Sequence, residues 1–174
     1  GLLPSGLKVF CAVLAWSRFR FVRVARDETA ATTMALLADC FDMLGGVPGK
    51  VLADRMGCLK GGTVANVMIP TPDYVRFATH YRFVPDFCHP ADPESKGIVE
   101  NLVGYAKRDL VLPDSDDLAV LNDACRDWCS EVNAREHSEI CAVPDVRLAE
   151  ERELLRELPM LRPRIGRVEV RKVD

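Results

Sequence analysis

Residues 7–24, LKVFCAVLAWSRFRFVRV, contain two apolar runs that decide how the chain begins to fold. The first run, residues 7–16, is almost continuously apolar, which is typical of a strand buried on both faces. The second run, residues 19–24, alternates aromatic or β-branched residues with arginine, which indicates a strand buried on one face. Only Ser17 and Arg18 separate the two runs. We therefore predict an antiparallel hairpin of two strands.

The spacing of apolar residues predicts the elements that follow the hairpin. Asp27 is the expected cap of a helix whose apolar stripe ends before a pair of glycines. The further elements are a strand at 50–53, a loop marked by Gly57, Gly61 and Gly62, a helix from Pro72, a strand at 82–88, helices beginning at Lys96–Gly97 and over 116–134, a short charged helix around 148–158 and a strand at 168–173. This order predicts an α/β protein with a mixed sheet, and both tryptophans, Trp16 and Trp128, are expected in its core.

The composition excludes several classes of protein. The chain has 174 residues, of which 48% are hydrophobic and 28% charged, so global disorder is excluded and one domain with a substantial core is expected. No apolar run approaches the ~20 residues of a membrane-spanning helix, and the first residues lack a signal-peptide pattern. Seven scattered cysteines indicate reduced thiols rather than disulfides, and Cys125 and Cys129, at i and i+4 on a predicted helix, are expected to be buried free thiols. We therefore predict a soluble, cytoplasmic protein.

Charge is distributed unevenly, although the 23 basic and 26 acidic side chains sum to only −3. Residues 1–26 hold five basic residues and no acid, whereas residues 114–139 hold eight acids and two arginines. The net charge argues against a nonspecific nucleic-acid binder, but segregated charge can build a basic face on such a protein. Arg18, Arg20 and Arg23 form either a DNA-facing strand surface or the solvated side of an edge strand.

Two acids stand out by their positions. Asp54 follows a predicted strand, and ligand sites in α/β sheets gather beyond the carboxyl ends of strands. Glu100 lies one turn into a predicted helix, and Lys96, Gly104 and Lys107 share the face of this glutamate. The glycine lets another backbone approach. Carboxylate oxygens coordinate Mg²⁺ and lysines neutralise phosphate, so this face suits a metal ion bound next to a phosphodiester.

Two motifs that contain these acids resemble those of a known family. Residues 45–60, GGVPGKVLADRMGCLK, and residues 89–110, HPADPESKGIVENLVGYAKRDL, are similar to the catalytic core of DDE transposases and retroviral-type integrases. The similarity is greatest to the larger transposase of two-gene bacterial insertion sequences, which works with a partner ATPase. It implies an RNase-H-like fold, metal-dependent hydrolysis at transposon ends, and attack of a 3′-hydroxyl on target DNA.

The resemblance also implies roles for single residues. Asp54 matches the second catalytic acid of the family and Glu100 the third, and both would bind Mg²⁺ or Mn²⁺ in a two-metal site. The candidate DNA-binding residues are Lys96, Lys107, Lys60, Arg55 and Arg108. The family often has asparagine at the position of Arg55. The first catalytic aspartate has no match, because no acid precedes Asp27. We expect it on a first strand upstream of Gly1, so that the hairpin matches the second and third strands of the family.

The resemblance divides the chain into two parts. Residues 1–134 would form an N-terminally incomplete catalytic core, and residues 135–174 a charged helical tail that leads toward a further C-terminal domain. The expected partners are transposon-end and target DNA, further copies of the chain and a partner ATPase, with no membrane. Without the first aspartate, we expect weak or no metal binding and no activity from these residues alone. Two alternatives stay open: an RNase-H-like nuclease that cuts without joining, and a non-catalytic remnant that binds DNA or associates with itself.

Overall fold

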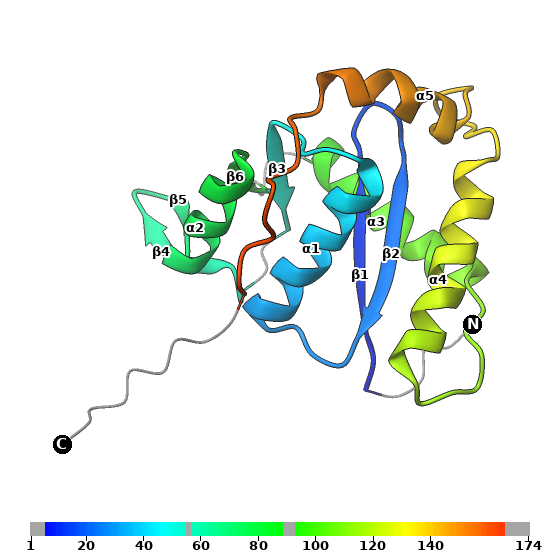
Figure 1. The fold of residues 1–174 in the computed structure, drawn as a ribbon, viewed down its shortest axis with the longest axis horizontal. Helices are drawn as coiled ribbons and strands as arrows, with labels where there is room; N and C mark the ends of the chain where they lie inside the picture. Colours follow the sequence, from blue (N-terminus) through cyan, green and yellow to red (C-terminus); the bar gives the residue numbers. More distant parts are fainter. Residues whose placement is uncertain (1–5, 55–56, 89–92, 166–174) are drawn as a thin grey trace.

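A computed structural model of the chain describes residues 6–54, 57–88 and 93–165 (Figure 1). The elements are, in chain order, β1 (Lys8–Val13), β2 (Arg20–Ala25), α1 (Ala30–Leu44), β3 (Lys50–Ala53), β4 (Lys60–Val64), β5 (Val67–Pro70), α2 (Pro72–Tyr81), β6 (Val84–Phe87), α3 (Pro93–Asp109), α4 (Leu118–Asn133), α5 (Pro144–Glu151) and a 3-10 turn at Arg152–Leu154. The prediction of an α/β protein is confirmed. Within the described residues the strands form three two-stranded sheets rather than one mixed sheet: β1–β2 antiparallel, β3–β6 parallel and β4–β5 antiparallel.

Strands β1 and β2 form the predicted hairpin, with Lys8 opposite Ala25. Their burial is the reverse of the expectation. Residues 21–25 of β2 are all buried, whereas β1 is only partly buried. The reason is α4, which packs along the outer edge of β2 (Figure 1). Arg23 is consequently 5% exposed, so the interpretation of the three hairpin arginines as one solvated or DNA-facing surface is wrong.

The side chains of the hairpin alternate between two hydrophobic cores. Phe21 points toward α1 and α2, where a set of aromatic rings packs with neighbouring centroids 4.8–6.5 Å apart: Phe41, Tyr74, Phe77, Tyr81 and Phe83. Val22 and Val24 point to the opposite face, where α3 and α4 pack. The hairpin is thus the middle layer of the fold, with α1 and α2 on one side and α3 and α4 on the other. This packing holds α3 against the hairpin.

The first helix begins at a threonine rather than at the expected aspartate. Thr29 is the N-cap of α1, and its hydroxyl accepts a hydrogen bond from the backbone N–H of Thr32 at 3.2 Å. The Asp27 carboxylate instead accepts from the N–H and the hydroxyl of Thr29, at 3.0 and 2.8 Å. Hydrogen bonds from Thr32 and Thr29 lower the pKa of Asp27. Asp27 therefore holds the capping residue in place and does not cap the helix itself.

Residues 60–70 form a hairpin where the sequence predicts a loop. Ala65 and Asn66 make its turn, with φ of 47° and 64°. Two consecutive left-handed residues are what a two-residue hairpin turn requires, but neither is the glycine that normally signals it. Gly61 lets the strands approach, because a Cβ there would lie 3.2 Å from the carbonyl oxygen of Pro70.

The segment after α4 crosses the end of the hairpin and then runs along α1 and α2 (Figure 1). The short helix expected near 148–158 begins earlier, at Pro144. Val47 and Arg156 donate to each other's carbonyl oxygens at 2.8 Å, which joins this segment to the loop after α1. The strand expected at 168–173 lies outside the described residues. Within them, no helix has the length and apolar character needed to span a bilayer.

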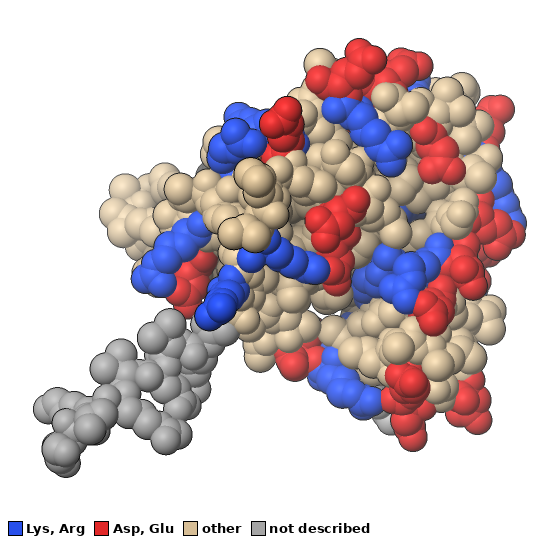
Figure 2. Space-filling model, in the orientation of Figure 1, with Lys and Arg blue, Asp and Glu red and all other residues tan. Residues whose placement is uncertain are grey.

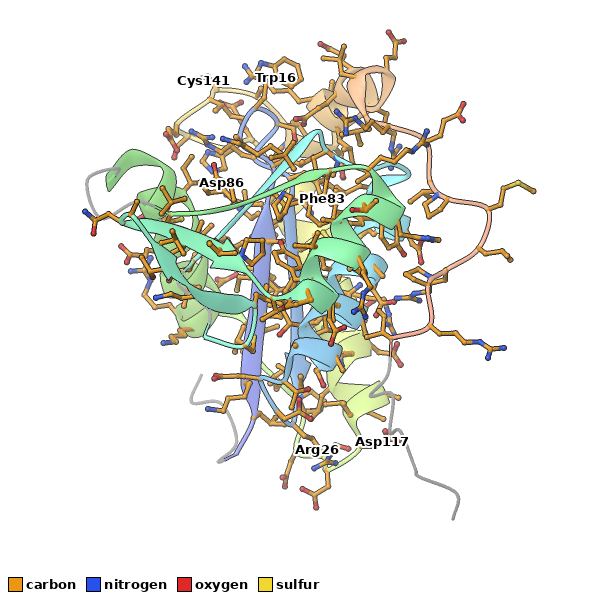
Figure 3. All side chains as sticks on the ribbon, turned by 90° about the vertical axis from the view of Figure 1, so that its left-hand side faces the viewer. Trp16, Arg26, Phe83, Asp86, Asp117 and Cys141 are labelled. Atoms are coloured by element: carbon orange, nitrogen blue, oxygen red, sulfur yellow. The ribbon has the colours of Figure 1, made fainter. Side chains whose placement is uncertain are left out.

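The two tryptophans differ in their environments. Trp128 is buried, as expected, and its Nε1 donates to Asp109 at 2.8 Å, which links α4 to α3. Trp16 is 47% exposed in the hairpin turn, so its assignment to the core is wrong. The guanidinium of Arg147 covers its ring, 4.9 Å from the centroid. Figure 3 shows Trp16 beside the loop that contains Cys141, at the opposite end of the hairpin from Arg26 and Asp117.

Candidate active site

Asp54 lies directly after β3, and its side chain is exposed. Strand β3 runs parallel to β6, with Ala53 opposite Phe87, and the N–H of Cys88 donates to the carbonyl oxygen of Ala53 at 2.9 Å. Both strands therefore end at one edge of the sheet. That edge is where α/β folds place ligands, since it collects the loops that follow the strands.

Glu100 lies on α3, the helix that follows β6 in the chain. The helix begins at Pro93, before the predicted start at Lys96–Gly97; proline is favoured in a first turn because it needs no hydrogen-bond acceptor there. Leu102 and Ala106 are buried against the hairpin, whereas Glu100 is exposed. Burial of these apolar residues turns the glutamate away from the core. It lies about 10 Å along the axis from the first residue of the helix.

The candidate DNA-binding residues lie on different elements. Lys107 and Arg108 are exposed on α3, within about two turns of Glu100. Lys60 is exposed on β4, which belongs to a separate hairpin. Lys96 is part of α3, but its side chain is outside the described residues, and so is the whole of Arg55. Lys107 and Arg108 thus share a helix with Glu100, and Arg108 lines the pocket described below.

The donor set at this site is chemically suited to a hard divalent cation but is incomplete. Asp54 and Glu100 supply carboxylate oxygens, which Mg²⁺ and Mn²⁺ prefer. However, within residues 6–54, 57–88 and 93–165, no group of three His, Cys, Asp or Glu side chains lies close enough to hold a metal ion. A two-metal site needs more ligands than two carboxylates. The described residues alone therefore do not form the expected metal centre.

Burial disfavours the thiolate form of several cysteines. Burial raises the pKa of the Cys11 and Cys40 thiols to about 12 and that of Cys125 to about 11. Cys125 and Cys129 lie at i and i+4 on α4 but point into the core, as free buried thiols. Their predicted role in packing is confirmed. Metal binding and nucleophilic attack both need the thiolate, which burial disfavours.

A pocket of about 400 Å³ lies between α3, the hairpin turn and the end of α4. The sequence analysis does not identify it. Its charged lining comprises Arg18, Arg20, Arg108, Arg135, Glu136, His137 and Glu139. By contrast, the face of the molecule seen in Figure 2 intersperses basic and acidic side chains and has no continuous basic patch.

Comparisons with known proteins indicate the same family as the sequence motifs. No protein-family model matches the chain. The chain is 33% identical over 151 residues to a transposase for an IS21-like insertion sequence element of Bacteroides fragilis, which covers 84% of this chain and 29% of that protein. It is 29% identical over 156 residues (88% of this chain) to a putative transposase for the element IS5376 of Geobacillus stearothermophilus, and 28% over 149 residues (84%) to a transposase for IS21 of Pseudomonas aeruginosa. The chain is homologous to IS21-type transposases.

The homologous region is only part of these relatives, because the chain spans 38% of the length of each of the latter two. Its fold matches the catalytic core domain of bovine immunodeficiency virus (BIV) integrase with a TM-score of 0.63 and 16% identity, over 84% of this chain and 88% of that one. It also matches a chain of a simian T-cell lymphotropic virus intasome, solved with a phosphatase regulatory subunit, with a TM-score of 0.58 and 16% identity; the match covers 97% of this chain and 54% of that one. The predicted resemblance and the integrase-core, RNase-H-like fold are therefore confirmed.

Proposed function

We propose that this chain is the catalytic core region of a transposase that cleaves DNA at the ends of a mobile element and joins the 3′ ends to target DNA. One observation carries the proposal. Asp54 lies at the carboxyl edge of the β3–β6 sheet, and Glu100 lies on the exposed face of the helix that follows β6, in a chain homologous to transposases over 151 residues. The whole transposase would act with DNA, with other copies of itself and with a partner ATPase.

We infer that a third carboxylate comes from a strand outside the described residues. Within them, β1 pairs only with β2 and β3 only with β6, so each sheet has an edge that can accept a further strand. Figure 1 shows β3, β1 and β2 in this order across the molecule, with α4 on the far side of β2. A strand inserted between β3 and β1 would join the two sheets into the mixed sheet that the sequence predicts. An aspartate on that strand would complete the acids of the site.

In the proposed reaction, the acids would bind metal ions and the basic residues would bind DNA phosphates. With Mg²⁺ or Mn²⁺ bound to the carboxylates, the site would supply an activated water or 3′-hydroxyl and a stabilised leaving oxygen. Asp54 and Glu100 would hold the ions. Lys107 and Arg108 would position DNA by neutralising phosphates next to Glu100, with Lys96, Arg55 and Lys60 as further proposed contacts.

The direct test uses the full-length transposase with Asp54→Asn or Glu100→Gln. Each variant is expected to lose cleavage of labelled transposon ends and joining to a plasmid target, and to retain binding to the ends. Asp73→Asn is the control, because Asp73 is an exposed acid on α2 that pairs only locally with Arg76, at 2.9 Å. Retained cleavage in either of the first two variants would overturn the proposal. Cleavage without joined products in the unmodified protein would instead identify a nuclease.

The 174-residue chain itself permits a second test. Because its described residues provide two carboxylates and no three-ligand cluster, calorimetric titration with Mg²⁺ or Mn²⁺ is expected to show weak binding or none. A mixture with a transposon-end duplex is expected to show no cleavage. Tight binding of two metal ions would prove that the carboxylates of this chain suffice.

A further inference from the structure

The pocket between α3, the hairpin turn and the end of α4 has the size and charge of a ligand site. Its volume of about 400 Å³ falls in the usual range for bound small molecules. Val13, Ile98 and Leu102 provide apolar walls. The lining holds four arginines and two glutamates, namely Arg18, Arg20, Arg108 and Arg135 with Glu136 and Glu139, and Arg135 also pairs with Glu131 outside the lining. The excess of positive charge favours an anionic ligand.

Arg18 is placed in the pocket by an unusual backbone conformation. Its φ of 58° is left-handed, which only glycine adopts without cost, and its N–H donates to the carbonyl oxygen of Leu14 at 3.0 Å to close the hairpin turn. The side chain is 15% exposed, and its guanidinium donates to the carbonyl oxygen of Ala15 and to Glu139, the latter at 3.0 Å. Its Nε is buried and has no hydrogen-bond acceptor among the described residues. A strained residue with an unsatisfied donor is typical of a functional position.

Arg20 is held on the opposite wall by α4. The side-chain amide of Asn133 binds both backbone groups of Arg20, at 2.9 and 2.8 Å. The guanidinium donates to the carbonyl oxygen of Val132 at 3.2 Å and lies over the ring of Tyr105, 5.3 Å from its centroid. These are neutral groups, so they do not balance the charge of the arginine. Burial lowers the pKa of Arg20, because its charged form is partly removed from water.

Both arginines and a glutamate of the pocket lie close enough to His137 to affect its pKa. Burial lowers its pKa first, and the charges of Arg20 and Arg18 lower it further, while Glu139 acts in the opposite direction. The arginines therefore outweigh the nearby carboxylate at this position. An anion that entered the pocket would offset their effect on the histidine.

We propose that this pocket binds a phosphate group, supplied in the whole transposase by the backbone of DNA lying across α3. Guanidinium groups bind phosphate through paired N–H donors, and a half-buried setting strengthens such bonds. Asn101, Tyr105 and Arg108 line the pocket from α3 at helical spacing, beside the face that carries Glu100. The assignment to DNA rests on the proposed function, whereas the phosphate site itself does not.

The first experiment follows the histidines of the 174-residue chain by NMR. The chain has three histidines, and His137→Gln assigns the signal of the one in the pocket. Inorganic phosphate, compared with chloride at equal ionic strength, is expected to raise the pKa of His137 and to leave His80 unchanged. Equal small shifts at both would mean that phosphate only screens charge, and would overturn the site.

Three arginine variants provide the matched comparison. Arg135 pairs with Glu131 on the surface of α4 and lines the pocket, whereas Arg126 pairs with Asp123 on the same helix and does not. Arg135→Gln and Arg108→Gln are each expected to weaken phosphate binding about tenfold, the usual loss for one charge-assisted hydrogen bond, with unchanged thermal melting. Arg126→Gln is expected to bind phosphate normally. An equal loss in Arg126→Gln would overturn the proposal.

A final measurement distinguishes DNA from free phosphate as the source of the group. Fluorescence anisotropy with a labelled transposon-end duplex is expected to show weaker binding by Arg135→Gln, with the slope of log affinity against log salt reduced by about one. Unchanged DNA affinity beside weakened phosphate binding would overturn the assignment to DNA and leave a site for free phosphate or a nucleotide. No readout requires strand cleavage, so failure of the proposed chemistry would leave these results intact.

Discussion

Asn133 at the end of α4 binds the backbone of Arg20 with both ends of its side-chain amide: it accepts from the N–H at 2.9 Å and donates to the carbonyl oxygen at 2.8 Å. Asn122 binds Val24 in the same way, at 2.9 and 3.0 Å. The two asparagines are three helical turns apart, about 16 Å, and the two strand residues are about 13 Å apart. Side chains of α4 thus replace a neighbouring strand along the outer edge of β2, which prevents edge-to-edge association there.

Replacing Asn133 by alanine is expected to lower the free energy of unfolding by about 1–3 kcal/mol, because the buried N–H and carbonyl of Arg20 lose their partners. Asn122→Ala is expected to do the same at Val24. Urea denaturation measures both effects, with Ser130→Ala on the exposed side of α4 as the control. A loss in Asn133→Ala no larger than that of the control would mean that water replaces the amide.

The spacing of apolar residues predicts those helices and strands in which the apolar residues of one face are the ones that become buried. The hairpin, the stripe of α4 and the buried side of α3 are correct for this reason, since Leu102, Ala106 and Cys125 each face a core. The β4–β5 hairpin is missed because Ala65 and Asn66 adopt left-handed conformations without a glycine to signal them. Such a turn is stabilised by the pairing of its strands, which a local pattern does not contain.

Features that combine distant segments are less predictable. Asn122 and Asn133 are polar positions beside the apolar stripe of α4, and only the packing of that helix on β2 gives them partners. The pocket gathers residues from the hairpin, α3, α4 and a loop, so its arginines look like solvated residues in the sequence. Asp54 and Glu100 are singled out because each lies inside a motif that resembles a known family. Their pairing as one site stays a prediction.

The depressed pKa of His137 predicts a pH dependence of stability. Because burial and the charges of Arg20 and Arg18 disfavour its protonation in the folded chain, the unfolded chain binds the proton more tightly. The resulting stability is fully present above the unfolded pKa of about 6.5 and is lost as the pH falls through the folded pKa. Unfolding in urea at pH 7.5 and at lower pH is expected to show a smaller pH effect in His137→Gln than in His80→Gln. An identical effect in both variants would contradict the prediction.

The cysteines are expected to fall into two classes of reactivity toward a thiol reagent. Cys141 is exposed and should react within the native chain, whereas Cys40, whose pKa burial raises to about 12, should react only on unfolding. Cys11 and Cys125 should behave like Cys40 for the same reason. Titration with a chromogenic disulfide, before and after addition of denaturant, counts the two classes, and Cys141→Ser should remove the rapid phase. Rapid native reaction of Cys11, Cys40 or Cys125 in that variant would show that a core opens.

Replacing Gly104 distinguishes an effect on the stability of α3 from an effect on the proposed contact of this helix with DNA. A Cβ at this position would meet no atom of the described residues within 4 Å, so nothing in the fold itself requires a glycine. Gly104→Ala is therefore expected to stabilise the chain by up to about 1 kcal/mol, the difference in helix propensity. If a DNA backbone approaches this face beside Glu100, the same change should weaken binding to a transposon-end duplex. Chemical denaturation and fluorescence anisotropy measure the two effects on one variant. Greater stability with unchanged DNA affinity would mean that the DNA passes elsewhere.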